Sequence, residues 1–365
     1  MNKLAFSYWK LGRTKEAAQL HEETLEIQKR ALGPEHPDTL QSMNNLAASY
    51  WSLGRMKESA QLNEETLEIQ KQALGLEHPD TLESMNGLAA AYRSLHRTKE
   101  AAQLDEETLE IRKRVLGPEH PNTLESMNGL AASYRRLGWM KEAAHLDKVT
   151  LEIRKHALGP EHPNTLWSMN NLAALYRSLG RMEEAVQLYE ETLEVGKQVL
   201  GLEHPNTLKS MNGLAASYRS VGRTEEAAHL DEETREIWTR VLGPGHPDTL
   251  ESMNGLAASC RSLGHTAEAA HLDEETLEIR KRALGPEHPD TLESMNGLAA
   301  SYQSLGRMKE APQLHEEMLE IGKRAFVPEH PDTLLSMNAL AESYFTLGRM
   351  KESADLHEET LDIRK

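Results

Sequence analysis

Cysteine is almost missing from this sequence, since Cys260 is the only one among 365 residues. A single cysteine excludes a disulfide framework and a cysteine-based zinc site, and it is consistent with a reducing compartment such as the cytoplasm. Apolar runs are also short, and none approaches the ~18 residues that span a bilayer. The first residues, MNKLAFSYWK, lack the charged-then-apolar order of a secretory signal. We therefore expect a cytoplasmic protein with no membrane partner.

Aromatic residues and basic charge are scarce as well. Phe, Trp and Tyr make up 5% of the chain, and 58 acidic residues against 41 basic ones give a net charge of −17. Binding to nucleic acid needs clustered Lys and Arg for phosphate contacts, so no nucleic-acid partner is expected. The mean hydropathy of −0.62 is too low for one large compact core, whereas the abundance of Leu and Ala argues against disorder.

Catalytic motifs are absent too. The sequence has no G-x-S-x-G, no H-E-x-x-H and no P-loop. Its many carboxylates, such as Glu64-Glu65 and Glu106-Glu107, fall at helix positions expected to be solvated. We therefore predict a protein that is not an enzyme and that has no cofactor and no metal site.

One unit of 42 residues is copied nine times without insertion or deletion. Eight His-Pro linkers, from His36-Pro37 to His330-Pro331, join the copies. No composition shift marks a boundary, so residues 1–365 are predicted to form one repeat array. The chain begins mid-helix and stops at Lys365 before another linker, from which we expect a segment of a longer protein. The first helix of each unit is marked by a methionine: Met1, Met43, Met85, Met127, Met169, Met211, Met253, Met295 and Met337.

Each unit is predicted to contain two helices. Asp80 after Pro79, with Glu83 three residues on, has the layout of an N-cap and capping box. Apolar residues then recur at steps of three and four, the spacing of one buried helical stripe. Gly54 is a predicted left-handed helix stop, and the second helix runs from about Met56 to Leu74. Two such helices cannot bury their apolar faces alone, so neighbouring units must stack. The predicted fold is an all-α solenoid.

The motif N-N-L-A-x-x-Y-x-x-x-G-R-x-x-E-A, followed by L-G-x-E-H-P, resembles the tetratricopeptide repeat of the kinesin light chain type. The unit is about two helical turns longer than the common 34-residue repeat. Similar near-identical arrays also resemble the C-terminal arrays of NOD-like (STAND) signalling ATPases. The resemblance covers the whole chain, and it implies a right-handed superhelix and a protein or peptide partner.

Several copies depart from the pattern, and we expect these places to be local weak points. His96 replaces the turn glycine, and Cys260 replaces a packing tyrosine, where a buried structural role is expected. Arg235 replaces a leucine. Pro312 is predicted to lie within the first turn of its helix, where the missing N–H matters least. Phe326-Val327 replaces Leu-Gly.

The linker histidines are predicted to hydrogen-bond nearby backbone groups. They recur every 42 residues, so stacking would hold them too far apart to share a metal ion.

The concave face of the first helices is the predicted binding face. An asparagine follows each later methionine, and a row of amides can pair with the backbone of an extended peptide; the alternative is that these residues brace neighbouring helices. They are Asn44, Asn86, Asn128, Asn170, Asn212, Asn254, Asn296 and Asn338.

A second row lies seven residues further, about two helical turns along the same face. Guanidinium groups bind carboxylates in a bidentate fork, so this row favours an acidic peptide, unless acids such as Glu83 and Glu251 neutralise it. The row contains Trp9, Trp51, Arg93, Arg135, Arg177, Arg219, Arg261, Gln303 and Phe345.

Other residues vary along this face. Trp167, Lys209 and Leu335 stand at the position where four other units have Glu. Glycine inside the helix, which costs about 1 kcal/mol against Ala, is expected to permit close approach of another backbone; the alternative is relaxed selection on a redundant array. These helix glycines are Gly87, Gly129, Gly213, Gly255 and Gly297.

We therefore predict a protein-interaction scaffold that binds an acidic peptide in its concave groove, as a kinesin light chain-like adaptor. One alternative is a sensor or autoinhibitory array of a larger NOD-like ATPase. Another is a structural solenoid whose near-identical ends associate head to tail.

Overall fold

The computed structural model describes the backbone of residues 2–325 and 331–363. Met1, Phe326-Val327 and His330 lie outside the described residues, as does the side chain of Trp9. Within the described ranges every regular element is an α-helix, as the sequence predicts. No described helix is long and apolar enough to cross a membrane.

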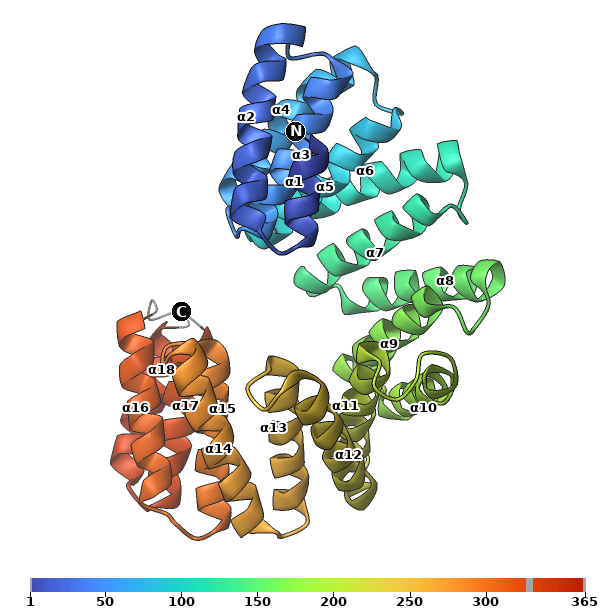
Figure 1. The fold of residues 1–365 in the computed structure, drawn as a ribbon. Helices are drawn as coiled ribbons and strands as arrows, with labels where there is room; N and C mark the ends of the chain where they lie inside the picture. Colours follow the sequence, from blue (N-terminus) through green and yellow to red (C-terminus); the bar gives the residue numbers. More distant parts are fainter. Residues whose placement is uncertain (1, 326–330, 364–365) are drawn as a thin grey trace. The chain divides into compact units, whose positions relative to one another are not determined.

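The helices alternate along the chain as first and second helices of each repeat (Figure 1). The first helices are α1 (Asn2–Lys10), α3 (Pro37–Ser52), α5 (Pro79–Ser94), α7 (Pro121–Arg136), α9 (Pro163–Ser178), α11 (Pro205–Ser220), α13 (Pro247–Ser262), α15 (Pro289–Ser304) and α17 (Pro331–Thr346). The second helices are α2 (Thr14–Leu32), α4 (Met56–Ala73), α6 (Thr98–Leu116), α8 (Met140–Leu158), α10 (Met182–Val199), α12 (Thr224–Leu242), α14 (Thr266–Leu284), α16 (Glu310–Ala325) and α18 (Met350–Ile363).

The linker histidine caps the first helix that follows it. Nδ1 of His78 accepts a hydrogen bond from the Asp80 N–H at 3.2 Å, and Pro79 occupies the first helical position, where a missing N–H is harmless. The predicted turn role of the histidine is confirmed. The predicted capping box is wrong: His78 rather than Asp80 is the N-cap, because the helix begins at Pro79, two residues earlier than predicted, and Asp80 therefore lies inside its first turn.

The first helices end in a left-handed residue. Gly54 has φ of 74°, as predicted, and His96 adopts φ of 60° at the equivalent place. A β-carbon makes this conformation cost roughly 1–2 kcal/mol. Replacement of glycine by His96 therefore places backbone strain at this position.

The methionines of the first helices form the centre of the core. Met43 is fully buried and packs with Leu25 from α2 and with Leu62 and Ile69 from α4. The apolar stripe of a first helix is thus shared between the second helix of its own repeat and that of the repeat before. Burial needs the neighbouring unit, as expected for a solenoid.

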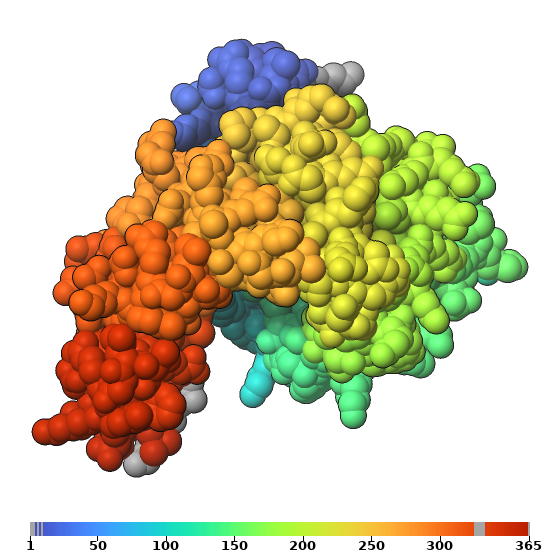
Figure 2. All heavy atoms as spheres, turned by 90° about the horizontal axis from the view of Figure 1, so that it is seen from below, coloured from blue at the N-terminus to red at the C-terminus, as the bar shows by residue number. Residues whose placement is uncertain are grey.

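The chain divides into two compact units, residues 1–175 and 176–365, with the boundary inside α9. In each unit a helix packs on the helices before and after it, and first helices of adjacent repeats also touch, as α5 and α7 do in one unit and α11 and α13 in the other. In the second unit, yellow, orange and red repeats follow one another in direct contact (Figure 2). We call the surface formed by the adjacent first helices the first-helix face.

Two departures from the repeat have local effects. Pro312 is the third residue of α16, as expected for the first turn. Because proline has no N–H to donate to the preceding turn, α16 begins at Glu310, while the equivalent helix α14 begins at Thr266, two positions earlier in the repeat. Arg235 is half-buried and pairs with Glu232 at 2.5 Å.

Candidate functional site

The predicted asparagines are all half-buried, and six of them line grooves on the first-helix face. Asn44 lines one groove, Asn86 and Asn128 line a second, and Asn212 lines a third together with Asn254 and Asn296. They also brace repeats, since Asn44 Oδ1 accepts a hydrogen bond at 2.9 Å from a serine of the next first helix, Ser84. Asn44 thus has the predicted bracing role, while contact of the asparagines with a peptide stays a prediction.

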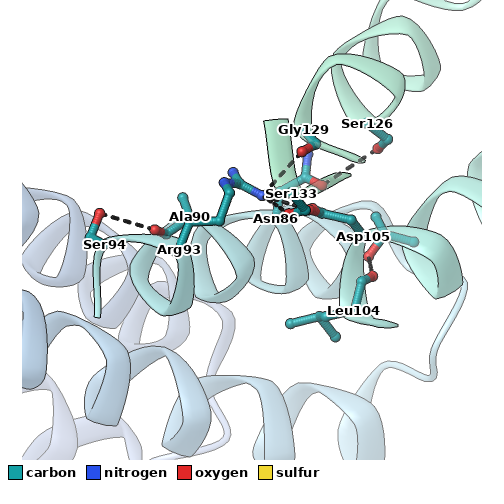
Figure 3. Close-up of polar contacts among 10 residues, drawn as sticks. Asn86, Ala90, Arg93, Ser94, Leu104, Asp105, Ser126, Gly129 and Ser133 are labelled. Atoms are coloured by element: carbon teal, nitrogen blue, oxygen red, sulfur yellow. Dashed lines mark hydrogen bonds and ion pairs between the residues drawn. The ribbon is translucent and has the colours of Figure 1, made fainter. Parts of the chain in front are cut away.

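Most of the arginines in the second row carry a buried partner. Arg93 Nη1 lies 2.6 Å from Asp105 Oδ2, and Asp105 keeps only 1% of its surface exposed. Asp105 lies on α6, the second helix of the same repeat (Figure 3). The same pairing joins Arg135 to Asp147 at 2.8 Å, Arg261 to Asp273 at 2.6 Å, and Arg219 to Asp231.

These ion pairs change the electrostatics that the sequence suggested. We expected a positive row, with Glu83 and Glu251 as its possible neutralising partners. Buried aspartates from the second helices neutralise four of the arginines instead. They recur in phase with the repeat, so alignment of the second helices would have revealed them.

Each such aspartate also links two repeats. Asp105 Oδ2 accepts a hydrogen bond at 2.6 Å from Ser133 on α7, and Arg93 donates to the Gly129 carbonyl at 3.5 Å (Figure 3). Burial raises the pKa of the Asp105 carboxyl, partly offset by Arg93. At the equivalent position, burial raises the pKa of Asp231 to about 6, opposed by Arg219 and Ser259.

The helix glycines make room for these second-helix side chains. A β-carbon at Gly129 would lie 3.2 Å from Asp105 Oδ1, and one at Gly213 would lie 2.3 Å from Cζ of Tyr189. We expected another backbone to approach, and this is wrong: the neighbour is a buried side chain of the preceding repeat. Gly87 is the loosest case, since its nearest neighbour would be Asn63 Nδ2 at 3.5 Å.

Arg177 differs from the other arginines of the row. Tyr189 occupies the position that Asp105 has in its repeat, and it is 3% exposed. Arg177 is exposed and forms no ion pair with any residue that the structure describes. It lines a groove with a cavity volume of about 550 Å³ together with Lys209 and Asn212.

The predicted tryptophans border the grooves of the first unit. Trp51 is 48% exposed and lines a groove of about 350 Å³ with Asn44. Trp167 is 40% exposed and lines a groove of about 770 Å³ that also contains Arg93 and Arg135. Both rings are therefore accessible from the grooves that they line.

Tyrosines at the ends of the first helices form a second polar link that the sequence analysis missed. Tyr92 donates a hydrogen bond at 2.7 Å to Glu64 of the preceding repeat. The guanidinium of Arg97 lies 3.8 Å from the centre of the Tyr92 ring and also pairs with Glu64 and Glu100. Burial raises the pKa of the Tyr92 phenol to about 12, and the Glu64 hydrogen bond adds to the shift.

Cys260, as predicted, is buried. It packs in an apolar cluster with Met253 and Leu256. Yet its sulfur, a ring nitrogen of His265 and a carboxylate oxygen of Glu268 lie within 4.8 Å of one another, a grouping that could hold a metal ion. The sequence pattern did not predict this grouping, because one cysteine and one histidine outside the linkers form no recurring set of metal ligands.

The sequence matches the family model of the tetratricopeptide repeat in overlapping segments along the chain, at residues 1–72, 44–114, 80–156, 141–198, 170–237, 213–282, 267–321 and 294–365. The chain belongs to the tetratricopeptide repeat family. No curated protein matches the sequence.

Solved structures agree with this tetratricopeptide assignment. A protein from Podosopora anserina, described as a kinesin light chain with nearly identical TPR-like repeats, is 36% identical with a TM-score of 0.52, over 57% of this chain and 99% of that one. BtubC (BKLC) from P. vanneervenii is 23% identical, with a TM-score of 0.54 over 65% and 94% of the two chains. The apo quorum sensor NprR from B. thuringiensis is 18% identical, with a TM-score of 0.66 over 100% and 97%. The last two support the fold alone, while the first confirms the resemblance to kinesin light chain repeats.

Proposed function

We propose that this tetratricopeptide array is a non-catalytic interaction scaffold that binds an extended peptide along its first-helix face. The observation that carries the proposal is the groove around Asn212, whose Oδ1 is buried and has no hydrogen-bond partner among the residues described. A buried acceptor without a partner costs about 1–3 kcal/mol. Rotation of the Asn212 amide toward the groove would bring Oδ1 to a peptide N–H and remove that cost, so Asn212 favours a ligand with free backbone donors.

Charge selects the peptide at one end of this groove. Arg177 and Lys209 are both exposed, line the groove, and lie close enough to Glu251 to interact with it electrostatically. Neither has an ion-pair partner in the described part of the chain, whereas Arg219 and Arg261 do. An acidic side chain of the ligand is therefore expected at Arg177 and Lys209, where a guanidinium and an ammonium can both reach it.

The remainder of the groove is not positive. Asp248, Glu251 and Glu293 line it as well, so a uniformly acidic peptide would meet repulsion along part of its length. The proposed ligand thus carries acidic residues where it faces Arg177 and uses backbone hydrogen bonds to the asparagines elsewhere. A peptide bound separately to the first unit would meet an apolar contact at Trp51. We infer a cytoplasmic adaptor of the kinesin light chain type, consistent with a chain that has one cysteine.

The test is a screen of the purified array against immobilised peptides with and without acidic residues. Arg177→Glu and Asn212→Ala should each weaken the selected peptides at least tenfold, with helicity unchanged. The control is Arg282→Glu, because Arg282 is exposed on α14 and pairs only with Glu278 on its own helix. Equal binding by Arg177→Glu and wild type would refute the proposed acidic contact.

Two outcomes would favour the other functions. Mass that grows with concentration in light scattering, without any peptide selected, would indicate head-to-tail self-association. A nucleotide-binding domain in the parent reading frame would favour the sensor array of a NOD-like ATPase.

A further inference from the structure

The repeat junction between α13 and α14 differs from the others in two residues at once. At the regular junction the first helix ends in a tyrosine, and an arginine before the second helix stacks on it, as Arg97 does on Tyr92. The arginine also pairs with a glutamate three residues on, as with Glu100. At this junction Cys260 takes the tyrosine position and His265 the arginine position, while Glu268 keeps the glutamate position.

The two exchanges affect groups that touch. Tyrosine and arginine are stacking partners in the regular repeat, so loss of the ring removes the surface on which the guanidinium lies. Another junction shows a matched exchange: Trp139 replaces the arginine and packs on Tyr134, with ring centres 5.4 Å apart. Cys260 and His265 likewise form a new pair, and their chemistry is that of metal ligands.

We propose that Cys260, His265 and Glu268 bind a single Zn²⁺ ion. Thiolate sulfur, imidazole nitrogen and carboxylate oxygen are the three donor types that Zn²⁺ accepts. Bonds of about 2.0–2.3 Å in a tetrahedral site put ligand atoms roughly 3.3–3.8 Å apart. The three ligand atoms already lie within 4.8 Å of one another, and the exposed side chains of His265 and Glu268 can move the remaining distance.

The position of the thiol supports a ligand role. Cys260 is 3% exposed, and its thiol has no hydrogen-bond partner among the described residues. The two other proposed metal ligands, His265 and Glu268, lie next to it and are exposed to solvent. The three protein atoms fill three of the four tetrahedral positions around the ion, so a water molecule would take the fourth. On binding, the thiol proton leaves to solvent and the sulfur coordinates as thiolate.

The local charge also suits a cation. In the regular repeat, a glutamate such as Glu64 accepts a hydrogen bond from the tyrosine hydroxyl of the next first helix. Glu232 has the same position in the repeat before Cys260, where no tyrosine is present, and it pairs with Arg235 instead. Glu268, Glu232 and Asp231 all lie close enough to the Cys260 thiol to interact with it electrostatically, opposed by Arg261. This excess of carboxylates favours a divalent cation beside the thiol.

The test compares the untagged wild-type chain with the double variant Cys260→Tyr/His265→Arg, which restores the regular junction and so preserves packing. Calorimetric titration with Zn²⁺ should find one more bound ion per chain in the wild type. With Co²⁺ as the probe, the wild type should show thiolate-to-cobalt charge-transfer absorption, and Cys260→Ser should lose it.

A matched control separates the site from a buried thiol alone. Tyr302→Cys in the restored background places a cysteine at the equivalent position, where Arg307 is retained. It should show neither the extra Zn²⁺ nor the absorption band. Equal Zn²⁺ stoichiometry in the wild type and the double variant, or a wild type without the cobalt band, would overturn the proposal.

Discussion

The helix glycines offer a direct test of the packing between repeats, because two of them should respond in opposite directions to alanine. Alanine is favoured over glycine in a helix interior by about 0.8–1.0 kcal/mol. At Gly87 the new methyl group would meet Asn63 at 3.5 Å or more, an ordinary contact. Gly87→Ala should therefore raise the free energy of unfolding by about 1 kcal/mol.

At Gly213 the same change should destabilise. The methyl group would lie 2.3 Å from Cζ and 2.6 Å from the hydroxyl oxygen of Tyr189, a ring that is 3% exposed and has little room to move. Forcing an extra carbon into a packed interior costs about 1–3 kcal/mol. After subtraction of the helix preference, Gly213→Ala should lose up to about 2 kcal/mol.

The assay is urea unfolding followed by circular dichroism on each single variant and on a cycle with Tyr189→Asn. In that background the site copies Asn63 and Gly87, so Gly213→Ala should become stabilising, with a coupling of about 1–3 kcal/mol. If Gly213→Ala raised the urea midpoint of the wild type as much as Gly87→Ala does, the tight contact with Tyr189 would be wrong.

Other parts of the fold give further predictions. Because the pKa of Asp231 is raised to about 6 from 3.8, its contribution to stability is full below pH 4 and is lost as the pH rises through 6; carboxyl NMR should find this titration, and Asp231→Asn should remove that part of the pH dependence of the urea midpoint. His120→Ala removes the acceptor of the Asn122 N–H and should cost about 0.5–2 kcal/mol, whereas unchanged thermal unfolding would contradict the capping role. His96→Gly relieves the left-handed φ and should add roughly 1 kcal/mol to the free energy of unfolding, which a lowered urea midpoint would contradict. Deleting residues 79–162, two whole repeats, should lower the urea midpoint yet leave a folded helical protein; loss of all helical signal would rule out a modular array.

The sequence was sufficient to predict the helix pairs and their stacking, because each depends on a pattern repeated in every unit. The methionine that begins each core segment, such as Met43, is buried as its position in the helical stripe predicts. Capping was less predictable. A histidine and an aspartate separated by one proline can each serve as an N-cap, and only the extended backbone at His78 decides that the helix begins after the histidine.

Pairing between helices was harder still to predict. Arg93 and Asp105 are 12 residues apart on different helices, and no spacing rule within one helix brings them together. The sequence placed the arginine on the correct face but gave no partner for it. A buried polar contact depends on the angle and distance between two helices, which the apolar pattern determines only coarsely.

Paired departures carry more information than single ones in an array of near-identical repeats. A lone exchange, such as His96 or Pro312, disturbs the backbone at its own position and meets no compensating change nearby. At Tyr189 the exchange leaves Arg177 without the buried partner that its counterparts keep, and at Cys260 it coincides with His265. In both places a contact that holds the regular repeat together is lost, and these are the places where we propose that the chain binds a ligand. Since the surrounding repeats maintain the frame, the loss of one such contact costs little cooperativity, and this is how a uniform solenoid can acquire a specific site.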